Sequence, residues 1–245
     1  VFDENKYDPV GALTAARMNK AIAICQFKAE GQMIMAHPEY NMEERLLLDK
    51  IDYENGTIAI DGKTYELRDK NFPTIDPQNP YEFTEDEKDL LRRLRASFEQ
   101  SEKLQKHIRF LFSHGALYKA YNNNLMYHGC VPMTENGEFE EVTIFGKTIK
   151  GKELFDYLDE QVRAAYFTPE KEDATNLMWY LWLGSKSPLF GKDKMTTLER
   201  CFVADESTHK ERTVPYYSLI EDKAICEKIL AEFGLDPESA HILSG

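Results

Sequence analysis

The longest regular pattern in this sequence is a set of apolar residues that recur at three- and four-residue steps across residues 84–111. Such spacing places the apolar side chains on one face of an α-helix. Thr84, with Glu87 three residues later, has the pattern of a capping box, which starts a helix. The sequence therefore predicts one long helix, with an apolar face made by Leu90, Leu91, Leu94, Phe98, Leu104, Ile108 and Leu111.

Shorter apolar patterns predict further helices. Asp8 followed by Pro9 is typical of a helix start, and Asn41 with Glu44 three residues later has the spacing of a second capping box. Gly234 is suited to the position just after a helix end. The predicted helices span residues 9–34, 41–51, 152–166, 173–183 and 219–233.

Strand patterns lie between these helices. Alternating β-branched and aromatic residues around Asp61 and Gly62 predict a β-hairpin over residues 55–68. The expected fold class is α+β. Further strands are expected over residues 117–121 and 125–127, in a second hairpin over residues 139–149, and as a buried strand at residues 240–243.

Composition restricts the classes of function. The chain has 245 residues, 42% of them hydrophobic, which is enough to bury a substantial core. Its formal charge of −13 repels nucleic acid and anionic membrane surfaces. No membrane-length apolar run or leader pattern is present, so we expect a cytoplasmic protein without nucleic-acid or membrane partners. The four cysteines lack CxxC spacing, which indicates buried free thiols.

The first candidate for chemistry is an apolar strand at residues 124–127 that stops at a histidine followed by glycine. Gly129 lets the backbone turn, and His128 can then project its imidazole into a cleft as a metal ligand. A structural histidine is the more common outcome when this pattern stands alone. His114 precedes Gly115 at a helix end, where we expect its ring to cap the last carbonyls.

The second candidate is a glycine-bounded loop over residues 184–194, which concentrates positive charge in an otherwise acidic chain. Freed backbone amides and ammonium groups suit a phosphate ester, although a solvated surface loop explains the pattern equally well. The P-loop spacing is absent. Arg200 and the mixed charges of residues 205–212 are more typical of an exposed helix or turn. The lysines of the loop are Lys186, Lys192 and Lys194.

Segments spread across the chain resemble class III fructose-1,6-bisphosphatase, the type found in Firmicutes and their relatives. The family belongs to the calcineurin-like metallophosphatases, so the resemblance implies a mixed αββα core with a dinuclear metal centre at strand ends. Because the similar segments are widely spaced, the resemblance covers essentially the whole chain. The segments are residues 67–77, 103–115, 124–133 and 187–210, the last with the sequence SPLFGKDKMTTLERCFVADESTHK.

On this resemblance, residues 1–115 are expected to be a mainly helical insertion with one β-hairpin, and residues 116–245 part of the α/β core. His128 matches the family's lone strand-end histidine. The family's GDxxDR and GNH motifs are absent from this sequence. We therefore expect an internal fragment of a longer enzyme, and one that binds no metal and does not catalyse alone, because one histidine cannot hold a metal pair.

The resemblance implies that the intact enzyme hydrolyses fructose 1,6-bisphosphate to fructose 6-phosphate and phosphate, a gluconeogenic reaction. It further implies a dinuclear Mn²⁺ centre with His128 as one ligand. The substrate's phosphates are expected to bind Lys186, Lys192, Lys194 and Arg200. A homo-oligomer is left open.

Two other functions fit the sequence. A serine/threonine protein phosphatase is one, because the strand-histidine-glycine element also occurs in that class. A non-catalytic interaction module is the other, with the helical residues 9–112 as its docking surface. A sugar bisphosphate and a phosphopeptide, tested side by side, separate the two enzymes.

Overall fold

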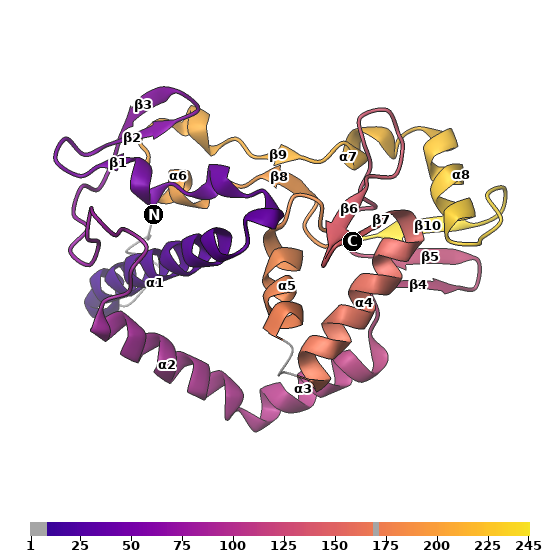
Figure 1. Ribbon diagram of the computed structural model, residues 1–245, viewed down its shortest axis with the longest axis horizontal. Coiled ribbons are helices and arrows are strands. Elements are labelled where there is room, and N and C mark those ends of the chain that lie inside the picture. The colour runs from indigo at the N-terminus through magenta and orange to yellow at the C-terminus, as the bar shows by residue number, and fades with distance from the viewer. Residues whose placement is uncertain (1–8, 169–171) are drawn as a thin grey trace. The chain divides into compact units, whose positions relative to one another are not determined.

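A computed structural model describes residues 9–168 and 172–245. The chain folds into two compact units of helices and small sheets, which confirms the α+β class (Figure 1). The first unit comprises Val1–Gln100 with Thr196–His209, and the second comprises Ser101–Met195 with Lys210–Gly245. None of the described helices is both long and apolar enough to cross a membrane.

This division differs from the expected one, which separated residues 1–115 from residues 116–245. Residues 101–115 belong to the second unit, and residues 196–209 return to the first. The return has a packing cause, because Leu198, Phe202 and Val203 are buried in the core of the first unit. Sequence position alone does not reveal such a return.

The first unit is built on one long helix and a small antiparallel sheet of order β1-β2-β3. At the turn between β2 and β3, Asp61 and Gly62 have φ values of 49° and 75°, so the predicted hairpin is confirmed. Its elements are α1 (Pro9–Ala36), η1 (Pro38–Tyr40), η2 (Glu43–Arg45), η3 (Leu48–Lys50), β1 (Ile51–Asp52), β2 (Thr57–Ile60), β3 (Lys63–Glu66), α2 (Glu85–Glu99), α6 (Thr197–Phe202) and η4 (Glu206–His209).

Helix α1 confirms the helix predicted from residue 9, while the expected cap at Asp8 lies outside the described residues. The short helix predicted over residues 41–51 is wrong. Two 3₁₀ turns, η2 and η3, stand there instead, separated by extended backbone at Leu46. Leu47 and Leu48, which follow this extension, are both buried in the core.

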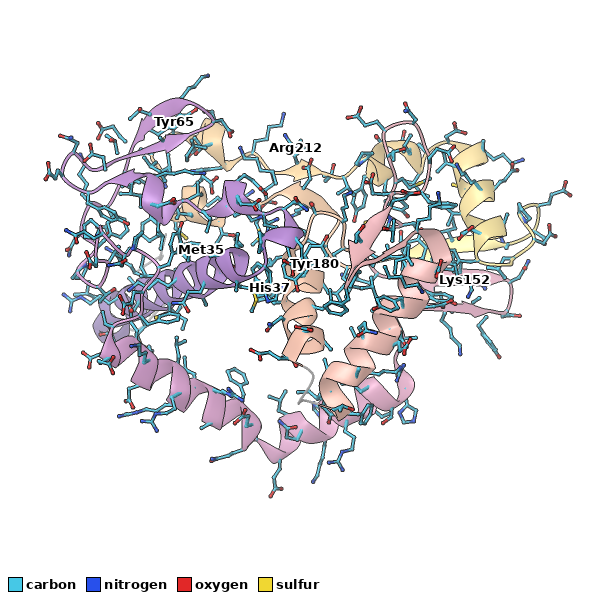
Figure 2. All side chains as sticks on the ribbon, in the orientation of Figure 1. Met35, His37, Tyr65, Lys152, Tyr180 and Arg212 are labelled. Carbon is cyan, nitrogen blue, oxygen red and sulfur yellow. The ribbon has the colours of Figure 1, made fainter. Side chains whose placement is uncertain are left out.

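The core of the first unit joins α1, the sheet and α6. Leu67 bridges to Val203, and the Arg68 amide donates a hydrogen bond to the Phe202 carbonyl at 2.8 Å. Tyr65 of β3, labelled in Figure 2, packs against the same core. The buried residues are Ile24, Phe27, Leu47, Leu48, Ile51, Ile58, Ile60, Leu67, Ile75, Tyr81, Leu198, Phe202 and Val203.

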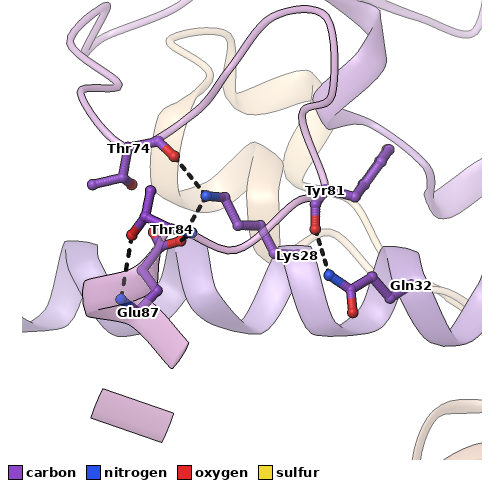
Figure 3. Close-up of polar contacts among 6 residues, drawn as sticks. All are labelled: Lys28, Gln32, Thr74, Tyr81, Thr84 and Glu87. Atoms are coloured by element: carbon purple, nitrogen blue, oxygen red, sulfur yellow. Dashed lines mark hydrogen bonds and ion pairs between the residues drawn. The ribbon is translucent and has the colours of Figure 1, made fainter. Parts of the chain in front are cut away.

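A buried ion pair links α1 to the start of α2 (Figure 3). The Lys28 ammonium lies 2.7 Å from the Glu87 carboxylate and also donates to the Thr74 carbonyl at 2.6 Å. Glu87 accepts from the Thr84 amide at 2.9 Å, which completes the predicted capping box. Burial alone raises the pKa of Glu87, but the hydrogen bonds from Lys28 and Thr84 bring it below its usual value.

The single helix predicted over residues 84–111 is wrong, because two helices stand in its place. Helix α2 ends at Glu99, and α3 (Glu102–His114) begins after Ser101. The Ser101 hydroxyl accepts from the Leu104 amide at 3.4 Å, so this residue acts as an N-cap. The apolar period continues through the break, which explains why periodicity alone did not show it.

The second unit contains a mixed sheet of order β10-β5-β4, in which β5 runs parallel to β10 and antiparallel to β4. The turn between β4 and β5 has Asn122 and Asn123 at positive φ, as the asparagine run predicts. Besides α3, its elements are β4 (Tyr118–Tyr121), β5 (Asn124–Tyr127), β6 (Val142–Ile144), β7 (Lys147–Ile149), α4 (Gly151–Phe167), α5 (Glu172–Leu183), β8 (Lys192–Lys194), β9 (Arg212–Thr213), α7 (Tyr216–Leu219), α8 (Lys223–Glu232) and β10 (His241–Ser244).

Helices α4 and α8 pack against this sheet, as Phe155, Ile229 and Leu230 join Leu125 of β5 in one core. The helix predicted over residues 219–233 begins later, as α8 at Lys223, because residues 220–222 form a turn between α7 and α8. Asp222 sets this later start, because its carboxylate accepts from the Ala224 amide and caps α8.

Strand β10 is not the buried strand that its apolar residues predict. Most of it is exposed, with Leu243 at 53%. Within the described part of the chain β10 is an edge strand, paired with β5 on one side. An edge position leaves apolar side chains accessible that a central strand would bury.

Candidate functional site

The histidine candidate lies at the carboxyl end of a parallel strand pair. Tyr127 ends β5 opposite Ser244 of β10, so the two strands finish together. His128 follows Tyr127 and is exposed. A Cβ atom on Gly245 would lie 3.2 Å from the His128 Nδ1 atom, which places the next backbone along β10 beside the imidazole. The predicted strand-end position is confirmed, and the role of metal ligand stays a prediction.

The structure brings this histidine and the lysine-bearing loop together. Gly129 has a φ of 80°, and a Cβ atom there would lie 2.4 Å from the Pro188 carbonyl oxygen. The Cys130 amide donates to the same carbonyl at 2.9 Å. A side chain at position 129 would overlap the Pro188 carbonyl oxygen, so this approach requires glycine. The loop at residues 184–191 is therefore fixed next to His128.

Replacing Gly129 by alanine is expected to lower the free energy of unfolding by about 2 kcal/mol or more, because positive φ and the clash with Pro188 both act. Gly234 is the matched control: it has a φ of 75° and open space around its Cβ position. Gly234→Ala should cost only the backbone strain. Urea unfolding of both variants measures the difference, and equal losses would mean that the loop does not press on Gly129.

The loop lysines are engaged by carboxylates. The Lys186 ammonium lies 2.6 Å from Glu140, and that of Lys192 lies 2.6 Å from Glu211. A phosphate would therefore compete with a carboxylate at each of these lysines. Lys194 is half-buried at the end of β8.

Strands β8 and β9 carry a second ion pair. Arg212, labelled in Figure 2, donates to both oxygens of Asp193 at 2.8 and 2.7 Å. With the Lys192 to Glu211 pair, this contact joins the two short strands by opposite charges on neighbouring positions. The positive charge that the sequence pattern indicates is therefore balanced locally.

Arg200 belongs to the first unit, on α6. Its guanidinium donates to the Thr196 hydroxyl at 3.1 Å and to the His209 carbonyl at 3.2 Å. These bonds hold the segment between α6 and η4. His114 closes α3 and lies 3.1 Å from the Phe110 carbonyl, so its predicted capping role is confirmed.

The hydroxyl groups of two buried tyrosines meet at the end of β5. The Tyr127 and Tyr216 hydroxyl oxygens are 2.6 Å apart. Burial raises the pKa of Tyr127 above its usual value and raises that of the neighbouring Cys130 thiol to about 12. These groups stay protonated at neutral pH, so none of them is a ready nucleophile or base. Tyr216 was missed by sequence reasoning, and its one signal is the tyrosine pair at positions 216 and 217.

The described residues do not by themselves fit a dinuclear metal centre. Among them no group of three or more histidine, cysteine, aspartate or glutamate side chains could hold a metal ion. His128 offers one accessible imidazole, whereas a divalent pair needs several carboxylate and nitrogen donors. Among the described residues, His128 is the candidate for one member of such a ligand set.

The chain belongs to the family described as Firmicute fructose-1,6-bisphosphatase, whose model matches residues 1–245. Fructose-1,6-bisphosphatase class 3 1 of Clostridium beijerinckii is 54% identical to it over 233 residues, which are 94% of this chain and 35% of that protein. Fructose-1,6-bisphosphatase class 3 of Alkaliphilus metalliredigens is 52% identical over 236 residues, 94% of this chain and 36% of the relative. The chain thus spans about a third of the length of these relatives. No solved structure matches it significantly.

Proposed function

We propose that this chain is the part of a class III fructose-1,6-bisphosphatase that carries one face of its active site. The intact enzyme would hydrolyse fructose 1,6-bisphosphate to fructose 6-phosphate and phosphate, as a cytoplasmic step of gluconeogenesis. The observation that carries this proposal is the family match over residues 1–245, with relatives that bear the name fructose-1,6-bisphosphatase class 3.

The proposed roles follow the geometry at the end of β5. His128 would be one ligand of a Mn²⁺ pair whose other ligands come from parts of the protein outside this sequence. The loop beside it would bind a substrate phosphate through Lys186, Lys192 and Lys194. A substrate-binding role for Arg200 stays a prediction. Support comes from the exposure of His128 and from the contact between Gly129 and Pro188.

The full-length polypeptide tests this proposal directly. Purified protein with added Mn²⁺ should release phosphate from fructose 1,6-bisphosphate and leave a serine phosphopeptide intact. Phosphopeptide hydrolysis alone would favour the protein phosphatase. An absence of both activities would favour the non-catalytic module, for which Trp182 is suited because it is 65% exposed. This chain expressed alone should be inactive, because its described residues supply too few metal donors.

Lys192→Ala in the full-length enzyme is expected to raise KM about tenfold, since a charge-assisted hydrogen bond to phosphate contributes about 1.5 kcal/mol or more. Lys223→Ala is the matched control, because that lysine forms an exposed ion pair with Glu227 at 3.1 Å on α8. Its KM should not change. Steady-state kinetics measure both variants, and an unchanged KM for Lys192→Ala would remove this lysine from the substrate site.

A further inference from the structure

Helix α7 contacts both halves of the candidate site through two consecutive tyrosines. Tyr216 is 1% exposed, and its hydroxyl bonds that of Tyr127 at 2.6 Å. The two rings also meet edge to face, with centroids 6.3 Å apart. Tyr127 is the last residue of β5 and precedes His128. Tyr216 therefore holds the end of the strand from which the histidine projects.

The second tyrosine meets the lysine-bearing loop. A Cβ atom on Gly191 would lie 2.5 Å from the Tyr217 hydroxyl oxygen and 2.8 Å from its Cε2 atom, so the ring lies against the loop backbone. The Val214 amide, just before α7, donates a hydrogen bond to the Gly191 carbonyl at 3.1 Å. This bond also holds the loop backbone at Gly191. Gly191 directly precedes Lys192. Tyr217 therefore supports the backbone from which the Lys192 side chain extends.

The two tyrosines are packed on each other, with ring centroids 5.2 Å apart and planes at 83°. A shift of one ring consequently disturbs the other. Tyr216 contacts the strand that presents His128, and Tyr217 contacts the loop that presents Lys192. The spacing between these two segments thus depends on α7 as well as on the direct contact at Gly129.

We infer that Tyr216 and Tyr217 are positioning residues that set the distance between the strand-end histidine and the phosphate-binding loop. The inference rests on the proposed function, because it assigns the histidine to the reacting end of the substrate and the loop to phosphate binding. Neither tyrosine needs to touch the substrate. Substitutions of the two tyrosines should then change different kinetic parameters, since each tyrosine supports a different part of the site.

Steady-state kinetics on the full-length enzyme test this separation. Tyr216→Phe should lower kcat about tenfold with little change in KM, because loss of the hydroxyl bond frees the strand end. Tyr217→Leu should raise KM about tenfold with little change in kcat, because the loop loses its support. Tyr217→Phe keeps the ring and should restore KM. Calorimetric titration with inorganic phosphate should show the same weakening in Tyr217→Leu and its rescue in Tyr217→Phe.

Tyr53→Phe is the matched control, because it removes a partly buried tyrosine hydroxyl that donates to the Leu48 carbonyl at 2.8 Å in the first unit. It should change stability without changing kcat or KM. All variants are measured well below their melting temperatures. If the wild type is active but Tyr216→Phe and Tyr217→Leu keep wild-type kcat, KM and phosphate affinity, the positioning role is overturned and the proposed function stands. If the wild type neither hydrolyses the sugar bisphosphate nor binds phosphate, the proposed function itself fails.

Discussion

Replacing His128 by alanine in the full-length enzyme is expected to lower kcat/KM by about 100-fold or more and to reduce the bound Mn²⁺. The basis is the proposed ligand role, since even residues that only orient metal ligands typically contribute 10–100-fold to metal affinity or activity. His128 is exposed at the end of β5, so its removal should change the free energy of unfolding by no more than about 0.5 kcal/mol. Kinetics, metal analysis by mass spectrometry and urea unfolding measure the three effects separately.

His241→Ala is the matched control for this variant. His241 is also exposed and lies on β10, the strand parallel to β5, but at its opposite end beside Asn124. It should keep full activity and metal content. An active, metal-loaded His128→Ala enzyme would show that the strand-end histidine is only structural, the alternative that its sequence pattern favours when taken alone.

Local chemistry could predict the elements whose cause lies within a few residues. The Asp61-Gly62 turn and the Thr84 capping box form as expected, because each depends on residues adjacent or three apart. The breaks were missed for a related reason. Ser101 and Asp222 are good N-caps inside apolar periods that continue past them, so the stop signal and the helix signal overlap.

Local sequence patterns could not predict how the parts of the candidate site come together. His128 and the loop lysines could be selected from the sequence as two separate segments. Their proximity depends on the backbone contact between Gly129 and Pro188, which are far apart in the sequence. The ion pair between Lys186 and Glu140 also depends on the tertiary fold, because the two residues are far apart in the sequence. Local spacing could not predict it. Tyr216 was missed because a buried tyrosine pair leaves no periodic signal.

Packing in the core of the first unit explains why the observed units differ from the expected division of the chain. Arg200 and the mixed charges of residues 205–212 are typical of an exposed helix or turn, yet Phe202 of the same region packs edge to face on Phe27 and on Phe72 in the first unit. The alternation of charged and apolar residues there does not identify the surface that the apolar ones will cover. Unit boundaries therefore depend on tertiary packing, and a division by sequence position cannot reproduce a chain that leaves a unit and returns.

Lys28→Met is expected to lower the free energy of unfolding by about 3–5 kcal/mol, because it leaves the Glu87 carboxylate buried without its cation. The Lys28 side chain is 0% exposed and that of Glu87 is 9%, so water cannot replace the lost partner. The Thr74 carbonyl also loses its donor. Lys20→Met is the matched control: its ion pair with Asp69 at 2.6 Å is partly exposed and should contribute about 1 kcal/mol or less.

The pH dependence of Lys28→Met separates loss of the charge pair from loss of packing. In the wild type the folded-state pKa of Glu87 is lowered, so its contribution to stability is complete above the unfolded value of about 4.3 and is lost as the pH falls through the folded pKa. Without Lys28, burial still raises that pKa and only the hydrogen bonds from Thr84 and Thr74 lower it, so the pKa of Glu87 is higher in the variant than in the wild type. Protonation of Glu87 then removes the unpaired buried charge as the pH falls. The stability difference between wild type and variant should therefore shrink below about pH 5 in urea unfolding. A difference that stays constant from pH 7 to pH 4 would assign the loss to packing of the lysine stem, because only an ionised carboxylate requires the ammonium.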